Sequence, residues 1–442
     1  MGLMQQISSS VRVTDEAHPA LKVPADLRLE RILHWLFGGA LLVRLLYPFY
    51  NSPLSHLYSD PQRHWENGMH LLDPPFMGSG DPIVYQVWLF LLIQIKGNAA
   101  VVIPTGTGFL CAAMPYGWYR AFKELLPKVW ALGGALLMAL VPGFLGAYAY
   151  FMNETPLLSL TGFAFWATFR AHRRRSVGAF ALACALWLLA GFSRTVALPM
   201  ALLCLLSLWL PQPQRLPKAL IGVAMLLIIA IPAGVHGRIN LGWFAPFGNP
   251  YLPQVYQASG NKIIAIDLGP KGRYEFGSPS FYNPTFYPLS DWLTDRGGVA
   301  SITVDLRRGR ADWIAEKKRV EQDRTFSTLR GYWENFLYLA FGQSWPDNDL
   351  GSVVCWLTVW TRWIWLPLVV VLAAAMLRGR FHGREWLLPL CGVGMFVYLM
   401  VQQQGVMEAR YRKPVDPVLV AAAVVLAWRS TRRDAAPAAS VA

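Results

Sequence analysis

The residues best suited to chemistry lie in one short polar stretch, Tyr58–Met69, which reads YSDPQRHWENGM. It contains the carboxylates Asp60 and Glu66 and the basic side chains Arg63 and His64. The stretch follows soon after a long apolar run, so we expect it at a membrane surface. A carboxylate in that position can take a proton from a hydroxyl group, and an arginine can hold two oxygens of a phosphate.

Three other groups of polar residues lie near the ends of apolar runs, where ionisable side chains are costly unless they have a partner or a function. They are Asn153–Glu154, Ser193–Arg194 and Glu408–Arg412. Each also has a structural explanation. Glu154 can begin a helix, Arg194 can extend to lipid headgroups, and His64 can be an ordinary loop residue. Together with the first stretch, however, they predict carboxylates and cations gathered at one membrane face.

The composition is that of a polytopic membrane protein. The chain has 442 residues, of which 54% are hydrophobic and 15% charged, and its mean hydropathy is +0.33. Several apolar runs approach the ~20 residues that cross a bilayer. The net charge of +14 does not indicate nucleic-acid binding, because the basic residues lie between apolar runs, where the positive-inside rule explains them. The five cysteines show no CxxC spacing, so neither a metal cage nor a disulfide framework is predicted.

The basic residues also predict the topology. Lys22, Arg28 and Arg31 precede the first apolar run and place the N-terminus in the cytoplasm, with no cleaved signal peptide. About ten spans then put every basic cluster between spans inside and leave both ends inside. The expected spans are 32–49, 98–119, 130–150, 156–169, 177–192, 196–210, 219–235, 353–376, 386–401 and 417–428. The apolar run 83–95 is too short to cross and is expected either at the membrane surface or as a re-entrant segment.

We therefore expect an all-α membrane protein in four parts. An N-terminal transmembrane module covers 1–236 and includes a first outer loop, 50–97. Residues 237–350 are rich in Gly, Pro, Asn and Tyr and predict a periplasmic region with interfacial helices. A C-terminal transmembrane module covers 351–434, and 435–442 forms a cytoplasmic tail. In the C-terminal transmembrane module, the last helix is expected to begin at about Pro417, after a non-helical segment, 404–416.

The polar groups on the outer side suggest one kind of reaction. Outside the cytoplasm there is no nucleotide supply, and activated sugars are carried there on polyprenyl phosphate. Their transfer needs a carboxylate that deprotonates the acceptor hydroxyl and cations that hold the departing phosphate. Asp60 is the candidate base. The candidates for the donor phosphate are Arg63, Arg194, Arg410 and Arg412.

Four short motifs resemble those of the GT-C superfamily of membrane glycosyltransferases, which includes protein O-mannosyltransferases and the lipid A aminoarabinose transferase. DPQRH at 60–64 is similar to the acidic motif of their first outer loop. The segment DPIVY at 81–85, followed by Gly97, resembles HPPLYYW…G with Asp in place of His. Ser193-Arg194 is similar to a Thr-Lys pair at the outer end of a middle span, and EARYRKPVDP at 408–417 to E-R-Y-R-x-P-x-x-P.

The resemblance implies a GT-C-like fold and transfer of a sugar, with inversion, from a polyprenyl-phosphate donor to a hydroxyl of a lipid, glycan or protein. It implies a bacterial inner membrane with the active site facing the periplasm. Asp60 would be the general base, and Tyr411 would stack on the sugar or form a hydrogen bond with it. The supporting or sugar-binding residues would be His64, Glu66, Asp81, Tyr85, Glu154 and Glu408. No cofactor is predicted firmly; a divalent cation held by Asp60, His64, Glu66 and Glu154 stays open.

Two other functions stay open. A polymerase or ligase of lipid-linked oligosaccharides needs arginines in long outer loops but no early aspartate. A lipid or solute transporter or flippase typically has paired halves with matching broken helices, which the sequence does not show. Asp60 also has a structural alternative, because Asp followed by Pro61 is a good helix start. Neither the sugar nor the acceptor follows from the residues.

Overall fold

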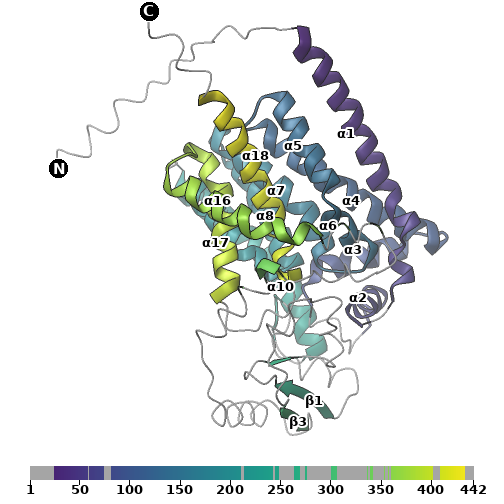
Figure 1. Cartoon of the computed structure of the whole chain (residues 1–442). Helices are drawn as coiled ribbons and strands as arrows, with labels where there is room; N and C mark the ends of the chain where they lie inside the picture. The colour runs from purple at the N-terminus through teal and green to yellow at the C-terminus, as the bar shows by residue number, and fades with distance from the viewer. Residues whose placement is uncertain are drawn as a thin grey trace, which may run out of the picture.

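The computed structural model describes residues 24–57, 59–73, 81–210, 214–241, 244–247, 263–268, 274–275, 300–305, 336, 339–341, 353, 357, 360–401 and 409–433. Helices dominate this part of the chain, which confirms the helical class (Figure 1). Of the interfacial helices expected in 237–350, the structure describes only residues 336 and 339–341. The predicted tail 435–442 and Glu408 lie outside the described residues.

Ten helices form the N-terminal half. They are α1 (Pro24–Tyr50), α2 (Ser59–Met69), α3 (Ile83–Gln94), α4 (Ala99–Lys123), α5 (Lys128–Leu140), α6 (Pro142–Gly146), α7 (Glu154–Arg174), α8 (Val177–Ser193), α9 (Leu198–Trp209) and α10 (Arg215–Leu241). The C-terminal helices are α16 (Trp365–Leu377), α17 (Leu387–Val401) and α18 (Asp416–Arg433). Short 3₁₀ turns are η1 (Pro53–Ser55), η3 (Ala147–Ala149), η4 (Thr195–Ala197), η7 (Arg362–Ile364), η8 (Gly383–Trp386) and η9 (Ala409–Arg412).

A small antiparallel sheet adds to this helical class and was not predicted. Strand β1 (Ile263–Leu268) lies between β2 (Tyr274–Glu275) and β3 (Ala300–Asp305). In the longer pairing, Ile263 faces Asp305 and Leu268 faces Ala300. The region 237–350 therefore holds β-structure in addition to the helices that were expected there, and the strands lie in a part of the region for which no helix was predicted.

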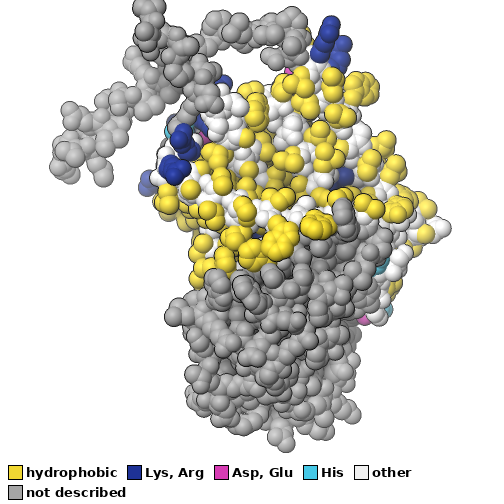
Figure 2. Space-filling view, in the orientation of Figure 1, with side chains coloured by type: hydrophobic (Ala, Val, Ile, Leu, Met, Phe, Trp, Pro, Cys, Tyr) yellow, Lys and Arg dark blue, Asp and Glu magenta, His cyan; other side chains and the backbone are white. Residues whose placement is uncertain are grey.

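Several helices are suited to a membrane. Among the described residues, four stretches are long and apolar enough to cross one, and a bent pair of helices makes a fifth if it is counted as one span. The four are Leu27–Ser55, Ala99–Lys123, Arg215–Ile239 and Gly383–Val401. Helices α3, α8, α9 with η4, and α16 are apolar but shorter. Figure 2 shows hydrophobic side chains covering much of the visible helical surface, as expected for a membrane protein.

The basic clusters between the helices gather at one end of the bundle. Three ion pairs join neighbouring helix ends there: Lys128–Glu30 at 2.5 Å, Arg173–Glu124 at 3.1 Å and Arg429–Glu385 at 2.6 Å. Arg384 links the same end by donating to the carbonyl oxygens of Phe169 and Glu124. The start of α1 and the end of α18 both lie at this end, as the alternating topology predicts (Figure 1). We call it the basic end.

Glycines allow the central helices to approach closely. A Cβ on Gly162 of α7 would lie 2.6 Å from the backbone nitrogen of Trp118 on α4, and one on Gly117 would lie 2.9 Å from the nitrogen of Phe163. Both distances are too short for a real side chain, so the two helices pack backbone to backbone. Trp118 is fully buried in the resulting core and stacks on Phe165, with ring centroids 5.4 Å apart.

The predicted span 130–150 is not one straight helix. It divides into α5 and the segment Pro142–Ala149, which comprises α6 and η3, and the two parts meet at an angle of 65°. The physical reason is Pro142, which lacks an N–H and cannot continue the helix. The break leaves backbone carbonyls at the end of α5 without helical partners, in a region that carries no water to satisfy them.

Arg44 on α1 supplies those partners. Its side chain is 1% exposed and donates to the carbonyl oxygens of Ala139 at 3.0 Å and Phe144 at 2.8 Å, on either side of the break. Its Nε donates to the carbonyl oxygen of Cys111 on α4 at 2.8 Å. That carbonyl has no helical partner, because the residue four positions later is Pro115. One arginine therefore satisfies the carbonyl that Pro115 leaves free and two carbonyls that flank the break at Pro142.

We expect Arg44→Met to destabilise the protein strongly. Methionine fills similar space but donates no hydrogen bond, so three buried carbonyls lose a charged partner, at a cost of about 3 kcal/mol or more. Thermal unfolding in detergent should show a markedly lower midpoint. Arg31→Met is the control, since Arg31 is exposed on the same helix. Equal midpoints for the two variants would contradict this role of Arg44.

Candidate functional site

The first-loop stretch forms helix α2, and one face of that helix carries its polar cluster. Asp60, Arg63, His64 and Asn67 occupy positions i, i+3, i+4 and i+7, which share a face of a helix. Arg63 donates to Asp60 at 2.6 Å through Nη1. It also donates to Asp81, just before α3, through Nε at 2.9 Å and Nη2 at 3.3 Å. Arg63 thus bridges two carboxylates, which the sequence analysis placed in separate motifs.

The other members of this face complete a shell around Asp81. Asn67 donates to Asp81 Oδ2 at 3.0 Å, and His64 Nδ1 lies 3.6 Å from the same oxygen. Gln86 in the first turn of α3 donates to the backbone carbonyl of Asp81 at 3.0 Å. We call Asp60, Arg63, His64, Asn67 and Asp81 the aspartate cluster. Its geometry fixes the entry into α3 against α2.

Charge pairing governs the protonation of this cluster. Burial on its own would raise the pKa of Asp81, but the nearby charges of Arg63 and His64 outweigh it, so this pKa lies below its usual range. Burial would likewise lower the pKa of Arg63, and Asp81 and Asp60 overcome that effect and raise it. Both groups are therefore held in their charged forms at neutral pH.

Glu66 and Tyr85 were predicted to support the site, and they take different places. Glu66 accepts a hydrogen bond from Gln62 at 2.8 Å on an exposed part of α2 and is not part of the aspartate cluster. Tyr85 is buried on α3, and its ring meets that of His64 edge-on, with centroids 6.1 Å apart. Tyr85 therefore packs behind the cluster.

A second polar group joins three separate segments. Glu154 begins α7, and Arg194 follows the last residue of α8, so the two opposite charges complement the dipoles of antiparallel helices. They form an ion pair, with Glu154 only 3% exposed and Arg194 16% exposed at the side chain. The Arg194 guanidinium also lies over the ring of Tyr411, 5.2 Å from its centroid. The sequence analysis predicted all three residues, and the structure brings them together.

The C-terminal motif differs from the non-helical segment that was expected at 404–416. Ala409–Arg412 forms the 3₁₀ turn η9, and α18 begins at Asp416, close to the predicted start at Pro417. Arg412 is 2% exposed and donates to Asp416 at 2.8 Å and to the Leu339 carbonyl oxygen. It also lies over the ring of Trp365. Its position is that of a buried structural residue, whereas the side chain of Arg410 is outside the described residues.

Packing places the aspartate cluster and the Glu154–Arg194 pair at the same end of the bundle. Trp65 on α2 stacks on Phe151, three residues before Glu154, with ring centroids 5.1 Å apart. Ile83 and Val84, at the start of α3, pack against the apolar cluster that contains Phe192, two residues before Arg194. This end is opposite the basic end, because α7 begins and α8 ends here, whereas α7 ends and α8 begins at the basic end. We call it the site end.

Two contacts of the site were missed by the sequence analysis. Asn67 lies seven residues after Asp60, so helical spacing alone could have added it to the face. Asp416 lies four residues after Arg412, which is the spacing of a helical ion pair. Within the described residues, no group of three or more His, Cys, Asp or Glu side chains is arranged to hold a metal ion.

Comparisons with known proteins do not assign the chain to a family. No protein-family model matches the chain, and no curated protein sequence matches it significantly.

The Arg63–Asp81 pair should make stability depend on pH. Because the pKa of Asp81 is lower in the folded state than its usual value of about 3.9, its stabilisation is present above that pH and is lost as the pH falls. We expect Asp81→Asn to lose about 1–3 kcal/mol at pH 7, typical of hydrogen bonds between charged groups. The midpoint difference from wild type should shrink towards pH 3. Asp73→Asn, at a 73% exposed side chain, is the control, and a pH-independent difference for Asp81→Asn would contradict the argument.

Proposed function

We propose that the protein is a GT-C-like glycosyltransferase that moves a sugar from a polyprenyl-phosphate donor to a hydroxyl acceptor. The observation that carries this proposal is the site end itself. A carboxylate fixed by an arginine and a partly exposed arginine lie at the same end of a membrane bundle, and the sequence motifs of four segments meet there. The acceptor is a lipid, a glycan or a protein hydroxyl.

In the proposed reaction, the acceptor oxygen attacks the anomeric carbon while the bond from that carbon to the phosphate oxygen breaks. Asp60 receives the acceptor proton, and the polyprenyl phosphate leaves with the bonding electrons. The Asp60 side chain is 26% exposed, so an acceptor can reach it, and its hydrogen bond to Arg63 orients the carboxylate. Attack on the face opposite the phosphate inverts the anomeric carbon.

Arg194 is the best-placed of the described candidates for the donor phosphate. It keeps partial exposure, whereas Arg412 is buried and Arg63 is bonded to two aspartates. Glu154 orients Arg194, and Tyr411 presents an aromatic ring beside it that can stack on a sugar. In this scheme Arg63 is a positioning residue for Asp60.

The full topology belongs to the same proposal. Ten spans, with both chain ends in the cytoplasm of a bacterial cell, would place the site end in the periplasm. The basic end supports this orientation, because cytoplasmic loops are enriched in Lys and Arg. The broken span α5–α6 with its buried arginine is a feature that transporters also have. In the described part of the chain, however, this break has no counterpart in a second half, and the Arg44 guanidinium donates to three protein carbonyls and lies over the Tyr148 ring.

The catalytic test is Asp60→Asn. Asparagine keeps the size and can still accept from Arg63, but it cannot take a proton, so turnover should fall by roughly 10²–10⁴-fold. Transfer from a labelled polyprenyl-phosphate sugar, measured with purified protein in detergent, checks this. Folding and donor binding should stay near wild type. Asp73→Asn, at an exposed aspartate in the same loop, should keep full activity.

An Asp60→Asn protein with full activity would move the base to Glu66 or Asp81. If the wild type binds the donor but neither hydrolyses nor transfers its sugar, a transporter is the better reading.

Orientation is tested by cysteine labelling in intact cells. His70 at the site end and Arg174 at the basic end are both exposed, so a cysteine at either place is reachable from its own side. The described natural cysteines, Cys111, Cys184, Cys204 and Cys391, are buried and should give little background. An impermeant maleimide should label His70→Cys and not Arg174→Cys. The opposite pattern would place the site end in the cytoplasm.

A further inference from the structure

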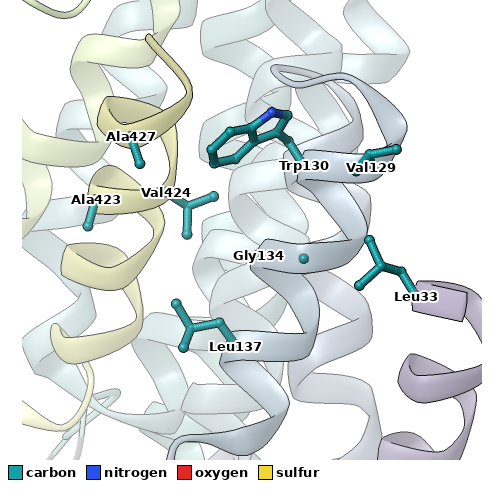
Figure 3. A pocket seen from close by; sticks show the side chains of 9 residues that line it. Leu33, Val129, Trp130, Gly134, Leu137, Ala423, Val424 and Ala427 are labelled. Carbon is teal, nitrogen blue, oxygen red and sulfur yellow. The ribbon is translucent and has the colours of Figure 1, made fainter. Parts of the chain in front are cut away.

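An apolar groove lies on the outer surface of the bundle, away from the site end. It has a volume of about 500 Å³, within the range of ligand pockets in proteins. Helix α5 forms its floor, and α1 and α18 form its walls (Figure 3). The lining residues are Leu33, Val129, Trp130, Gly133, Gly134, Leu137, Ala423, Val424 and Ala427.

Glycine creates the hollow. A Cβ on Gly133 would meet no atom within 4 Å, so the missing side chain leaves open space above the floor. Gly134 has a different role, because a Cβ there would lie 2.9 Å from Val424 on α18. The absence of a side chain at Gly134 therefore allows α18 to pack closely against α5. Figure 3 shows Trp130 and Leu137 on the same helix, above and below Gly134. Every lining side chain is apolar, so the groove suits a hydrocarbon chain.

The end of the groove lies at the basic end. Lys128 begins α5 immediately before the lining residue Val129. Arg432 follows Ala427 by five residues, so it lies about 7.5 Å further along α18 and about 140° round that helix, on the side of Trp428. Lys128 is paired with Glu30. Arg432 is exposed, stacks on Trp428 at 4.6 Å, and forms no ion pair among the described residues.

We propose that this groove binds one acyl chain of an anionic phospholipid of the surrounding bilayer, with the headgroup phosphate at Arg432. The apolar lining, the position on a membrane bundle and the positive charge at its end together favour this occupant over an uncharged one. Burial of each methylene contributes about 0.8 kcal/mol, and a surface cation adds attraction to an anionic headgroup. The lipid would hold α1 against α18 at the end where the chain enters and leaves the bundle. This proposal is independent of the glycosyltransferase reaction.

The test is native mass spectrometry of purified protein exchanged into micelles with either dioleoyl phosphatidylglycerol or dioleoyl phosphatidylcholine. The two lipids carry the same chains and differ in headgroup charge. Wild type should retain one phosphatidylglycerol and less phosphatidylcholine. Gly133→Phe fills the groove and should lower retention of phosphatidylglycerol about tenfold, since about two methylenes lose their contacts.

Two further variants keep the test sharp. Gly394→Phe on α17 is the matched control, because Gly394 is exposed and a Cβ there also meets nothing within 4 Å. It should retain lipid as wild type does. Arg432→Gln should abolish the preference for phosphatidylglycerol and leave the weaker binding of phosphatidylcholine. Equal retention by Gly133→Phe and Gly394→Phe would overturn the proposal. So would a dimer that only Gly133→Phe disrupts, because a second copy would then occupy the groove.

Discussion

The fold depends on how backbone carbonyls are satisfied where water is absent. Pro115 and Pro142 each interrupt a helical hydrogen-bond ladder inside the bundle, and an unpaired carbonyl there is costly. Arg44 resolves both interruptions with one side chain, since its fork donates to carbonyls on α4, α5 and α6. A lysine could not reach three separate carbonyls in fixed directions. The bend after α5 can therefore persist, and it carries the chain towards Glu154.

At the site end, arginines pair with carboxylates, as Arg44 pairs with backbone carbonyls inside the bundle. Each predicted arginine whose side chain is described there has found a protein partner. Arg63 holds Asp60 and Asp81, Arg194 holds Glu154, and Arg412 holds Asp416. Paired charges at helix ends avoid the cost of isolated ones and also fix how the helices meet. The contacts that fix the helices are thus the same ones that would position the site in the proposed reaction.

The sequence predicted most helices because apolar runs bounded by Arg clusters are strong signals. The expected span 177–192 and the helix Val177–Ser193 nearly coincide. It predicted the members of the site less completely. The pairing of Arg63 with Asp81 depends on how α3 folds back on α2, and the burial of Arg412 depends on Leu339 and Trp365, which are distant in sequence. The break at Pro142 was missed because hydropathy reports the length and composition of an apolar run and not where the helix axis changes direction.

The charge balance at the site end constrains how a phosphate can bind. Among its described ion pairs, the acidic groups Asp60, Asp81, Glu154 and Asp416 face the arginines Arg63, Arg194 and Arg412. These pairs offer no surplus positive charge to the donor phosphodiester, which carries one negative charge, or to the polyprenyl phosphate that leaves, which carries up to two. Arg194 must therefore either share its fork between Glu154 and the phosphate or release Glu154 when the donor arrives. Sharing is the cheaper course, because release would leave a carboxylate that is 3% exposed without its cation. In the proposed reaction the remaining positive charge would come from Arg410, because its position in the motif, next to Tyr411, suits that task.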